Sequence, residues 1–469
     1  MKHSWSLSII LMLFAFALRA QIEDNGDEHH SMNPSTHTDS TVKSIRDFVA
    51  NGVVTGNIRN FFMASINEDD FYDYYANAWG GRLGYTTAEF HGFQVGVQGI
   101  FVYNVASNNI ARLDPVAGKP SRYEAQLFDL QDLHNRNDLD RLEELFLYYN
   151  FKNSYIEIGK LNKKTPLLNP QDSRMKPYVF EGVWADIREW NNLRVQLGYF
   201  WRASPRSITD WHQIGDAIGL HSNGYYTDGT QANYLGQLET NGLAIAGADY
   251  LFSDALKLSV WNYYLDQILN TVFTQLDYKK NKWIVGLQYL RQDPISNGGK
   301  VEEGHSYYDP NQNTNLVSSR LGLKLKKHLF SLNFTHIAAS GRFVFPREFG
   351  REQFYTTLPR MRLEGLGNTN AMAFRYLYSP LNSKKLQIKL EAGLVQTPEV
   401  YTYTLNKYNQ VSYAQSVVDL NYRPSKIWKG LAFRLLYVYR ENLTSYPDPA
   451  LTFNQSNLHH LNFITNISF

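Results

Sequence analysis

The stretch GFQVGVQGIFVY, residues 92–103, alternates apolar side chains with polar or small ones at a period of two. Its apolar side chains share one face: Phe93, Val95, Val97, Phe101 and Tyr103. The opposite face carries Gln94, Gly96 and Gln98. Successive side chains of a β-strand point to opposite faces, so strict alternation predicts a strand with one apolar and one polar face.

The same alternation recurs along most of the chain, for example in LRVQLGYFWR (193–202), LQIKLEAGLV (386–395) and GLAFRLLYVYR (430–440). It predicts about eighteen strands, an even number. Their expected ranges are 52–65, 74–90, 92–103, 141–152, 154–162, 178–189, 193–203, 242–252, 255–266, 268–280, 282–292, 315–327, 328–339, 368–379, 386–396, 411–423, 430–440 and 458–469. One further apolar stretch, 231–239, is placed inside a connection because a strand there would break the pattern of connections described next.

The connections between these strands fall into two classes. Those after even-numbered strands are mostly short: around His91, 152–153, 190–192, 253–254, Asn281, 327–328, 382–385 and 426–429. Most of those after odd-numbered strands are long: 104–140, 163–177, 204–241, 293–314, 340–367, 397–410 and 441–457, with 66–73 and 267 as short exceptions. Short turns at one end and long loops at the other are typical of an outer-membrane β-barrel, whereas a sandwich has no reason to sort its loops this way.

Composition agrees with a barrel wall. The chain has 32 Tyr, 27 Phe and 9 Trp, yet its mean hydropathy is −0.40. Lipid-facing apolar residues that alternate with water-facing polar ones give this combination. The chain has no Cys, which excludes disulfides, thiol catalysis and thiolate metal sites.

The N-terminus predicts export. Lys2 is followed by an apolar run from Leu7 to Leu18, long enough for a signal-peptide core and too short to span a bilayer. We place the signal peptide at 1–20, with cleavage after Ala20. The whole chain has 46 basic and 44 acidic residues, and removal of 1–20 takes away Lys2 and Arg19 and no acid. The balanced charge of the mature chain argues against a nucleic-acid partner.

Residues 21–51 are polar and predict a flexible arm before a barrel at 52–469. Three histidines in the arm, His29, His30 and His37, are read as a solvated tail rather than a metal site. At the other end, HHLNFITNISF (459–469) predicts a last strand with an outward apolar face and a terminal Phe469. It resembles the signal read by the bacterial barrel-assembly machinery, a predicted partner together with outer-membrane lipid.

Two stretches resemble the OprD-type porin family: TPLLNPQDSRMKPYVFEGVWADI (165–187) and FPREFGREQFYTTLPRMRLEG (345–365). Matches in the second are Pro346, Arg347, Glu348, Gly350, Arg351, Glu352, Pro359, Arg360, Arg362, Glu364 and Gly365. The resemblance implies an eighteen-stranded unit with a narrow channel, constricted by the inward-folded loops 163–177 and 340–367. It also implies passage of small carboxylate-bearing solutes such as amino acids, guided by lumenal arginines. The implied constriction residues are Arg347, Glu348, Arg351, Glu352, Arg360, Arg362, Glu364, Asp172 and Arg174.

The residues themselves leave two interpretations of the 340–367 loop open. Its arginines and glutamates are interleaved, so Arg–carboxylate bonds could brace the loop, or guanidinium groups could face the lumen and attract anions. Basic residues at inward positions on strands form a predicted lumenal ladder: Arg194, Arg202, Arg320, Lys324, Arg375, Lys389, Arg423, Arg434 and Arg440.

We therefore predict an all-β outer-membrane porin of a Gram-negative bacterium for passive diffusion of small polar solutes, selective or not. No G-x-S-x-G, H-E-x-x-H or Gly-rich phosphate motif is present, so no enzyme, metal or cofactor is predicted. Residues 21–50 are too few for a plug domain. A structural or adhesive barrel and an apolar-solute transporter stay open, as does the choice between monomer and homotrimer.

Overall fold

The computed structural model describes residues 42–68, 70–170, 173–302, 305–380, 385–424, 429–445 and 448–469. The predicted signal peptide 1–20, its cleavage site, the arm up to residue 41 with His29, His30 and His37, and Asp172 lie outside the described residues. Within the described part, no helix has the length and hydropathy needed to cross a bilayer.

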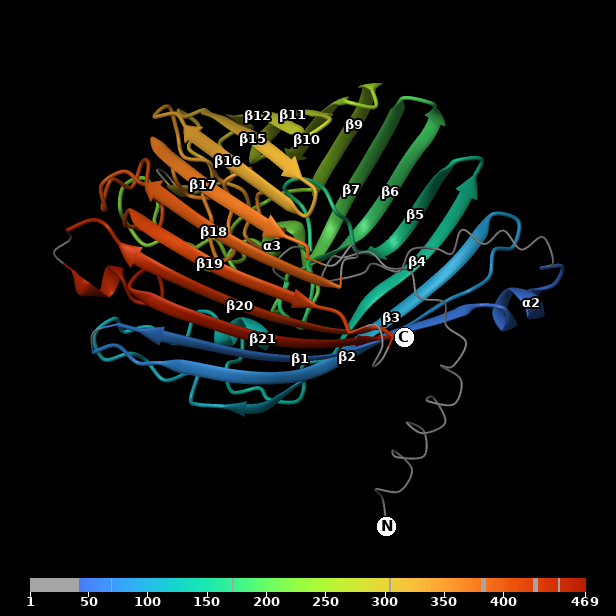
Figure 1. The fold of residues 1–469 in the computed structure, drawn as a ribbon, viewed down its shortest axis with the longest axis horizontal. Coiled ribbons are helices and arrows are strands. Elements are labelled where there is room, and N and C mark those ends of the chain that lie inside the picture. Colours follow the sequence, from blue (N-terminus) through green and yellow to red (C-terminus); the bar gives the residue numbers. More distant parts are fainter. Residues whose placement is uncertain are drawn as a thin grey trace, which may run out of the picture.

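Eighteen antiparallel strands form a closed barrel, as the alternating pattern predicted (Figure 1). They are β1 (Val53–Asn67), β2 (Tyr74–Thr86), β3 (Phe93–Ser107), β4 (Arg141–Phe151), β5 (Ser154–Leu161), β6 (Val179–Trp190), β7 (Leu193–Ser204), β9 (Leu243–Ser253), β10 (Leu256–Leu265), β11 (Leu269–Lys280), β12 (Trp283–Pro294), β15 (Thr314–Leu325), β16 (His328–Ile337), β17 (Thr369–Tyr378), β18 (Leu386–Gln396), β19 (Tyr413–Tyr422), β20 (Leu431–Asn442) and β21 (Leu458–Ser468). Each pairs with its neighbours in sequence, and β1 pairs with β21 to close the ring. Closure leaves no unpaired strand edge in the wall.

The long connections hold only short elements. These are the helices η2 (Glu124–Leu127), α3 (Ile214–Ala217) and η3 (Pro449–Leu451), and the strands β8 (His212–Gln213), β13 (Lys300–Glu302) and β14 (His305–Ser306). Residues 231–239 form no strand, which agrees with their placement in a loop.

Side chains along each strand alternate between the two faces of the wall. On β7, Leu197 is 44% exposed on the outward face, whereas its neighbour Gln196 is buried toward the interior. The outward row of β2 likewise includes exposed apolar residues such as Trp79 and Leu83. Apolar side chains are stable there only if lipid covers them, which is the arrangement of a transmembrane barrel.

Two predicted strand ends are wrong by four residues: β3 continues to Ser107 instead of ending at 103, and β2 ends early. The range 74–90 was expected, but β2 ends at Thr86. The Thr87 hydroxyl accepts a hydrogen bond from the Val95 backbone N–H, and the Gln94 side chain donates to the Thr87 carbonyl. The Thr87 hydroxyl thus takes a backbone N–H of β3 although the Thr87 N–H still donates to the Val95 carbonyl, because Thr competes locally for backbone groups.

The outward position of Leu197 makes a direct prediction about stability. Leu197→Arg should lower the free energy of unfolding by roughly 2–4 kcal/mol, the cost of a cation on the lipid face near the bilayer midplane. The matched variant Leu197→Phe keeps the apolar face and should cost less than about 1.5 kcal/mol. Urea titration of the barrel in lipid vesicles measures both. Equal losses for the two variants would place Leu197 away from lipid.

A helix, α2 (Ile45–Ala50), stands where the sequence indicated the end of a flexible arm. The Ser44 hydroxyl accepts a hydrogen bond from the Asp47 backbone N–H, which is a helix N-cap. The ring of Phe48 lies 6.2 Å from that of Phe90 in the β2–β3 turn. The N-cap and the Phe48–Phe90 contact hold residues 44–50 in a defined structure, whereas their polar composition predicted a flexible arm.

Two connections contribute many buried residues to the apolar core: 162–178 between β5 and β6 and 338–368 between β16 and β17. Phe349, Leu358, Met361 and Leu363 of the second connection are fully buried in the main apolar core. Phe349 also packs against Phe180 of β6, with ring centroids 5.8 Å apart. The core of this protein therefore lies inside the barrel, between the wall and the inward-folded loops.

Candidate functional site

The 340–367 loop is bound to the inner wall at several points. The Tyr355 backbone N–H donates to Ser318 on β15, and Gln415 on β19 donates to the Pro359 carbonyl. Arg375 on β17 donates to the Thr357 carbonyl. Partners on three different strands hold the loop against the inner wall.

A buried ion pair lies within this loop. Arg347 bonds to Glu364, and its guanidinium lies 3.5 Å from the centre of the Tyr408 ring. The Lys407 ammonium is 4.0 Å from the same carboxylate and faces the rings of Tyr234, Tyr307 and Tyr408. Burial alone would raise the pKa of Glu364, but Arg347 and Lys407 outweigh it and hold that pKa below its usual value. Burial also lowers the pKa of Lys407, to about 7.

The other charged side chains of the loop bond mainly to backbone groups. Glu348 accepts hydrogen bonds from the Gly219 and His221 backbone N–H groups at 3.0 and 2.9 Å. Arg351 donates to the carbonyls of Met361 and Leu358, and Glu352 accepts from the Leu363 N–H. Arg362 is half-buried and donates to the Tyr178 hydroxyl. These contacts match the bracing interpretation of the interleaved charges.

Arg360 reaches the barrel wall at β21. Its Nε donates to Nε2 of His460 at 2.9 Å, and a terminal nitrogen donates to Asn462 at 2.9 Å. Its φ of 66° is rare for a residue with a side chain. A second arginine, Arg440 on β20, donates to the Arg360 carbonyl and holds this backbone in place.

The 163–177 loop repeats this arrangement with different residues. Arg174 has a φ of 61° and is buried, and its carbonyl accepts a 2.6 Å hydrogen bond from Arg59 on β1. In each inward loop, therefore, an arginine in the left-handed conformation has its carbonyl bound by an arginine of the wall. Such backbone strain persists only where the surroundings fix it, and it concentrates at functional sites.

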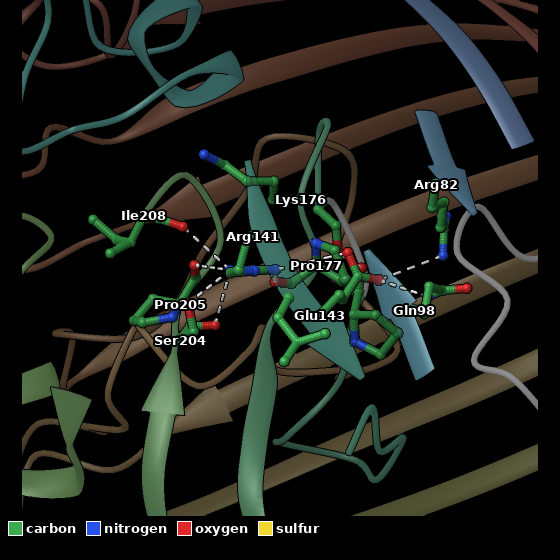
Figure 2. Close-up of polar contacts among 12 residues, drawn as sticks. Arg82, Gln98, Arg141, Glu143, Lys176, Pro177, Ser204, Pro205 and Ile208 are labelled. Carbon is green, nitrogen blue, oxygen red and sulfur yellow. Dashed lines mark hydrogen bonds and ion pairs between the residues drawn. The ribbon is translucent and has the colours of Figure 1, made fainter. Parts of the chain in front are cut away.

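Arg141 on β4 holds the end of this loop against the wall (Figure 2). Its guanidinium donates to the carbonyls of Pro177, Pro205 and Ile208 and to the carbonyl and hydroxyl of Ser204. The Glu143 carboxylate lies 3.9 Å from the Arg141 guanidinium and 3.7 Å from that of Arg82. It also accepts a 3.2 Å hydrogen bond from the Gln98 side chain. The nearby ammonium of Lys176 is buried, and this burial lowers its pKa to about 7.

The predicted ladder residues lie on inward positions, and the structure groups several of them around carboxylates. Arg194 binds Asp186, Arg202 lies 3.6 Å from Glu181, and Arg375 bonds to Glu391 at 3.1 Å. Arg434 binds both oxygens of Asp419, and Lys389 lies 3.6 Å from that carboxylate. The remaining four occupy separate environments: Arg440 bonds to Gln415, Arg320 to Asn333, Lys324 is exposed near the β15–β16 turn, and Arg423 follows β19.

A cavity of about 210 Å³ opens on the inner face of neighbouring strands β12 to β18. Arg320, Arg375 and Lys389 line it together with one carboxylate, Glu391. The Arg320 guanidinium lies 4.2 Å from the Tyr355 ring, so the inward loop adjoins this cavity. Three cations against one carboxylate make the lining positive, which suits binding of anionic groups. A larger cavity of about 460 Å³ lies among the long loops near Asp216 and Glu239.

Three wall residues of this site, Arg59, Arg82 and Arg141, were missing from the predicted set. All three are buried on inward positions of their strands. The period-two pattern that identified the ladder would also have found Arg59 and Arg82, because each alternates with outward apolar residues. Within the described ranges, no three His, Asp or Glu side chains meet as a metal site requires.

The sequence matches the profile described as outer membrane porin, OprD family, over residues 46–360. A search of curated protein sequences finds no significant match. Among solved structures, OccK9 (OpdG) of Pseudomonas aeruginosa superimposes with a TM-score of 0.69 at 14% identity, over 90% of this chain and 99% of that chain. OccAB2 of Acinetobacter baumannii gives 0.66 at 17% identity, with coverage of 90% and 99%.

A third similar structure is OpdK of Pseudomonas aeruginosa with vanillate, at a TM-score of 0.64, 16% identity and coverage of 90% and 99%. At these low sequence identities, the superpositions show that the fold is shared. The profile match covers well over half of the chain. A closed barrel with an apolar outer face, a positively charged interior cavity and no enzyme motif is consistent with both findings. The chain belongs to the OprD family of outer membrane porins, non-enzymatic, substrate-specific channels of the Gram-negative outer membrane.

Proposed function

We propose that this channel passes small carboxylate-bearing solutes, amino acids among them, by way of the lumenal cavity. The observation that carries the proposal is the lining of that cavity by Arg320, Arg375 and Lys389. Arginine and lysine at an inner wall attract carboxylates, and low-dielectric surroundings strengthen the attraction. Glu391 in the same lining offers a partner for the ammonium group of an amino acid.

The contacts available to a solute here are of moderate strength. Arg375 already forms an ion pair with Glu391. The Lys389 side chain is 39% exposed and lies 3.6 Å from Asp419, so it can also contact a solute. Arg320 is held by Asn333 and the Tyr355 ring, which fixes its guanidinium beside the inward loop. Passage requires binding that is favourable enough for entry and weak enough for release, and partly paired cations meet this requirement.

The similar structure of OpdK holds vanillate, a small carboxylate, which supports the same class of solute for this chain. An apolar-solute transporter is disfavoured because the lining named above is charged. We further propose that the residues of the two inward loops named in the sequence analysis shape the constriction, mainly by bracing it. Only Arg362 among their described arginines is half-buried rather than buried.

The double variant Arg320→Gln/Lys389→Gln tests the proposal in planar bilayers. It removes two cations and leaves Arg375 with Glu391 and Arg434 with Asp419. Each lost charge should cost about 1 kcal/mol for a carboxylate at a wet wall, roughly fivefold, so the double variant should lower acetate permeability relative to sodium by roughly 25-fold. The reversal potential in a sodium acetate gradient should therefore shift toward that of cations.

The matched control is Arg291→Gln. Arg291 lies on the outward face of β12 and binds Asp293, so its loss should leave the reversal potential unchanged. Heat-modifiable migration on a gel shows that each variant is folded. A folded double variant with the reversal potential of the unmodified channel would refute the proposed role of the cavity.

We also propose that the last strand is recognised by the barrel-assembly machinery. Phe469 exchanges backbone hydrogen bonds with Gly56 at 2.9 and 3.0 Å, and its ring fills the space beside that glycine. The terminal residue thus helps to close the barrel seam between β1 and β21.

A further inference from the structure

Helix α2 presents an exposed apolar face outside the barrel. Ile45 is 75% and Val49 is 55% exposed among the described residues. They lie four positions apart and therefore on one side of the helix. The third apolar side chain, Phe48, contacts Phe90 in the β2–β3 turn instead. Packing against the turn thus leaves Ile45 and Val49 as an apolar face directed away from it.

The contacts of α2 place it on the lipid side of the wall. Tyr85 belongs to the outward row of β2, and its hydroxyl donates to the Val49 carbonyl. The chain then passes over the Tyr85 ring at Gly52, where a Cβ atom would collide with the Tyr85 hydroxyl. The Ala88 backbone N–H donates to the Phe48 carbonyl at 3.0 Å and fixes the helix to the turn. Figure 1 shows α2 at the edge of the barrel, beside the start of β1.

The wall next to α2 carries aromatic residues at the same level. Phe93 starts β3 on its outward face, and its ring lies 4.6 Å from that of Tyr149 on β4. Tyr149 in turn stacks with Phe151 at 6.1 Å. Aromatic girdles of this kind mark the boundary between hydrocarbon and headgroups in outer-membrane barrels. The short turns lie at the periplasmic end, so this boundary belongs to the inner leaflet of the outer membrane.

Charged residues of α2 fit the same environment. Lys43 and Arg46 are exposed, while the one acid of the segment, Asp47, accepts a hydrogen bond from the Ser44 hydroxyl. Interfacial helices combine an apolar face with basic side chains, which meet acyl chains and lipid phosphates respectively. We propose that α2 is an interfacial helix that inserts Ile45 and Val49 into the inner leaflet and rests on the periplasmic aromatic girdle.

The chain contains no Cys, so single cysteines report on this helix without background. Ile45→Cys and the control Ala50→Cys both replace exposed residues, and Ala50 lies on a different side of the helix. Each is labelled with a small fluorophore in the full mature protein, in vesicles of phosphatidylethanolamine and phosphatidylglycerol. Nitroxide lipids quench a label in the membrane, and iodide quenches a label in water.

We expect nitroxide lipid to quench the label at position 45 at least about threefold more strongly than the label at position 50, and iodide to show the reverse order. Equal quenching by iodide at both positions would overturn the proposal. A label at position 45 that is shielded from both quenchers would also overturn it, because residues 21–41 or a second copy would then cover the face. Heat-modifiable migration confirms a folded barrel in each case.

Discussion

Replacing Arg141 with methionine is expected to release the 163–177 loop from the barrel wall and to make the channel noisy. Arg141 is buried and donates five hydrogen bonds to four residues, one at the end of β7 and three on two connections. Methionine fills a similar volume but donates nothing, so the carbonyls of Pro177, Pro205 and Ile208 would lose this donor. Each buried group left unpaired costs about 1–3 kcal/mol.

Loss of Arg141 also removes one of the two cations beside Glu143. The other, Arg82, remains 3.7 Å from the Glu143 carboxylate. The combined local cost is expected at about 3–5 kcal/mol, the range found when one partner of a buried charged network is removed. The sheet around β4 keeps its backbone ladder, so the damage should be confined to the loop. The loop would then exchange between inward and displaced positions, which gives larger and fluctuating conductance.

Single-channel recording measures this effect, and Arg188→Met is the control. Arg188 is half-exposed and shares Asp186 with Arg194, so its loss leaves that carboxylate paired. The control should conduct with the steadiness of the unmodified channel. Conductance of the Arg141 variant that is equally steady, in a barrel shown to be folded, would mean that Arg141 does not hold the loop.

The wall was predictable because it obeys one local rule. Each strand has lipid on one side and water or packed loops on the other, so its apolar and polar side chains must alternate. For β18, this alternation predicted the observed range 386–396. Where side chains bond to the backbone, this rule fails. The end of β2 at Thr86 and the helix after Ser44 depend on single hydroxyl contacts that periodicity does not register.

The candidate site was predictable as a region but not as a set of partners. Arg347 and Glu348 are neighbours in the sequence, yet Arg347 pairs with Glu364. Glu348 instead accepts hydrogen bonds from backbone N–H groups of the 205–242 connection. Pairing inside a folded loop depends on how distant connections meet, and sequence spacing does not contain that information. The inward position of Arg320 and Lys389, in contrast, followed from strand alternation.

The second large effect is expected at the Arg347–Glu364 pair. Arg347→Met leaves the Glu364 carboxylate, which is 1% exposed, with Lys407 at 4.0 Å and the Tyr408 hydroxyl at 3.3 Å. Removal of one partner of a buried pair costs about 3–5 kcal/mol. Arg347 is the largest of the charges that lower the pKa of Glu364, so its removal should let burial raise that pKa above its present value. A raised folded-state pKa means that the cost is present at neutral pH and falls as protonation removes the charge. The loop defect should therefore lessen as the pH falls from neutral to mildly acidic.

The double variant Arg347→Met/Glu364→Gln separates a charge effect from a loss of shape. Neutral side chains of similar volume often replace a buried ion pair without loss, so the second substitution should restore most of the free energy lost in the first. Proteolysis of the 340–367 loop in the folded barrel measures this directly: slow in the unmodified protein, fast in Arg347→Met, and slow again in the double variant. The double variant should also lose the part of the pH dependence that comes from position 364, because Gln does not titrate, whereas Lys407 still does. If the loop of the double variant is cleaved as fast as that of the single variant at every pH, then Arg347 stabilises the loop through its contact with the Tyr408 ring and not through the carboxylate.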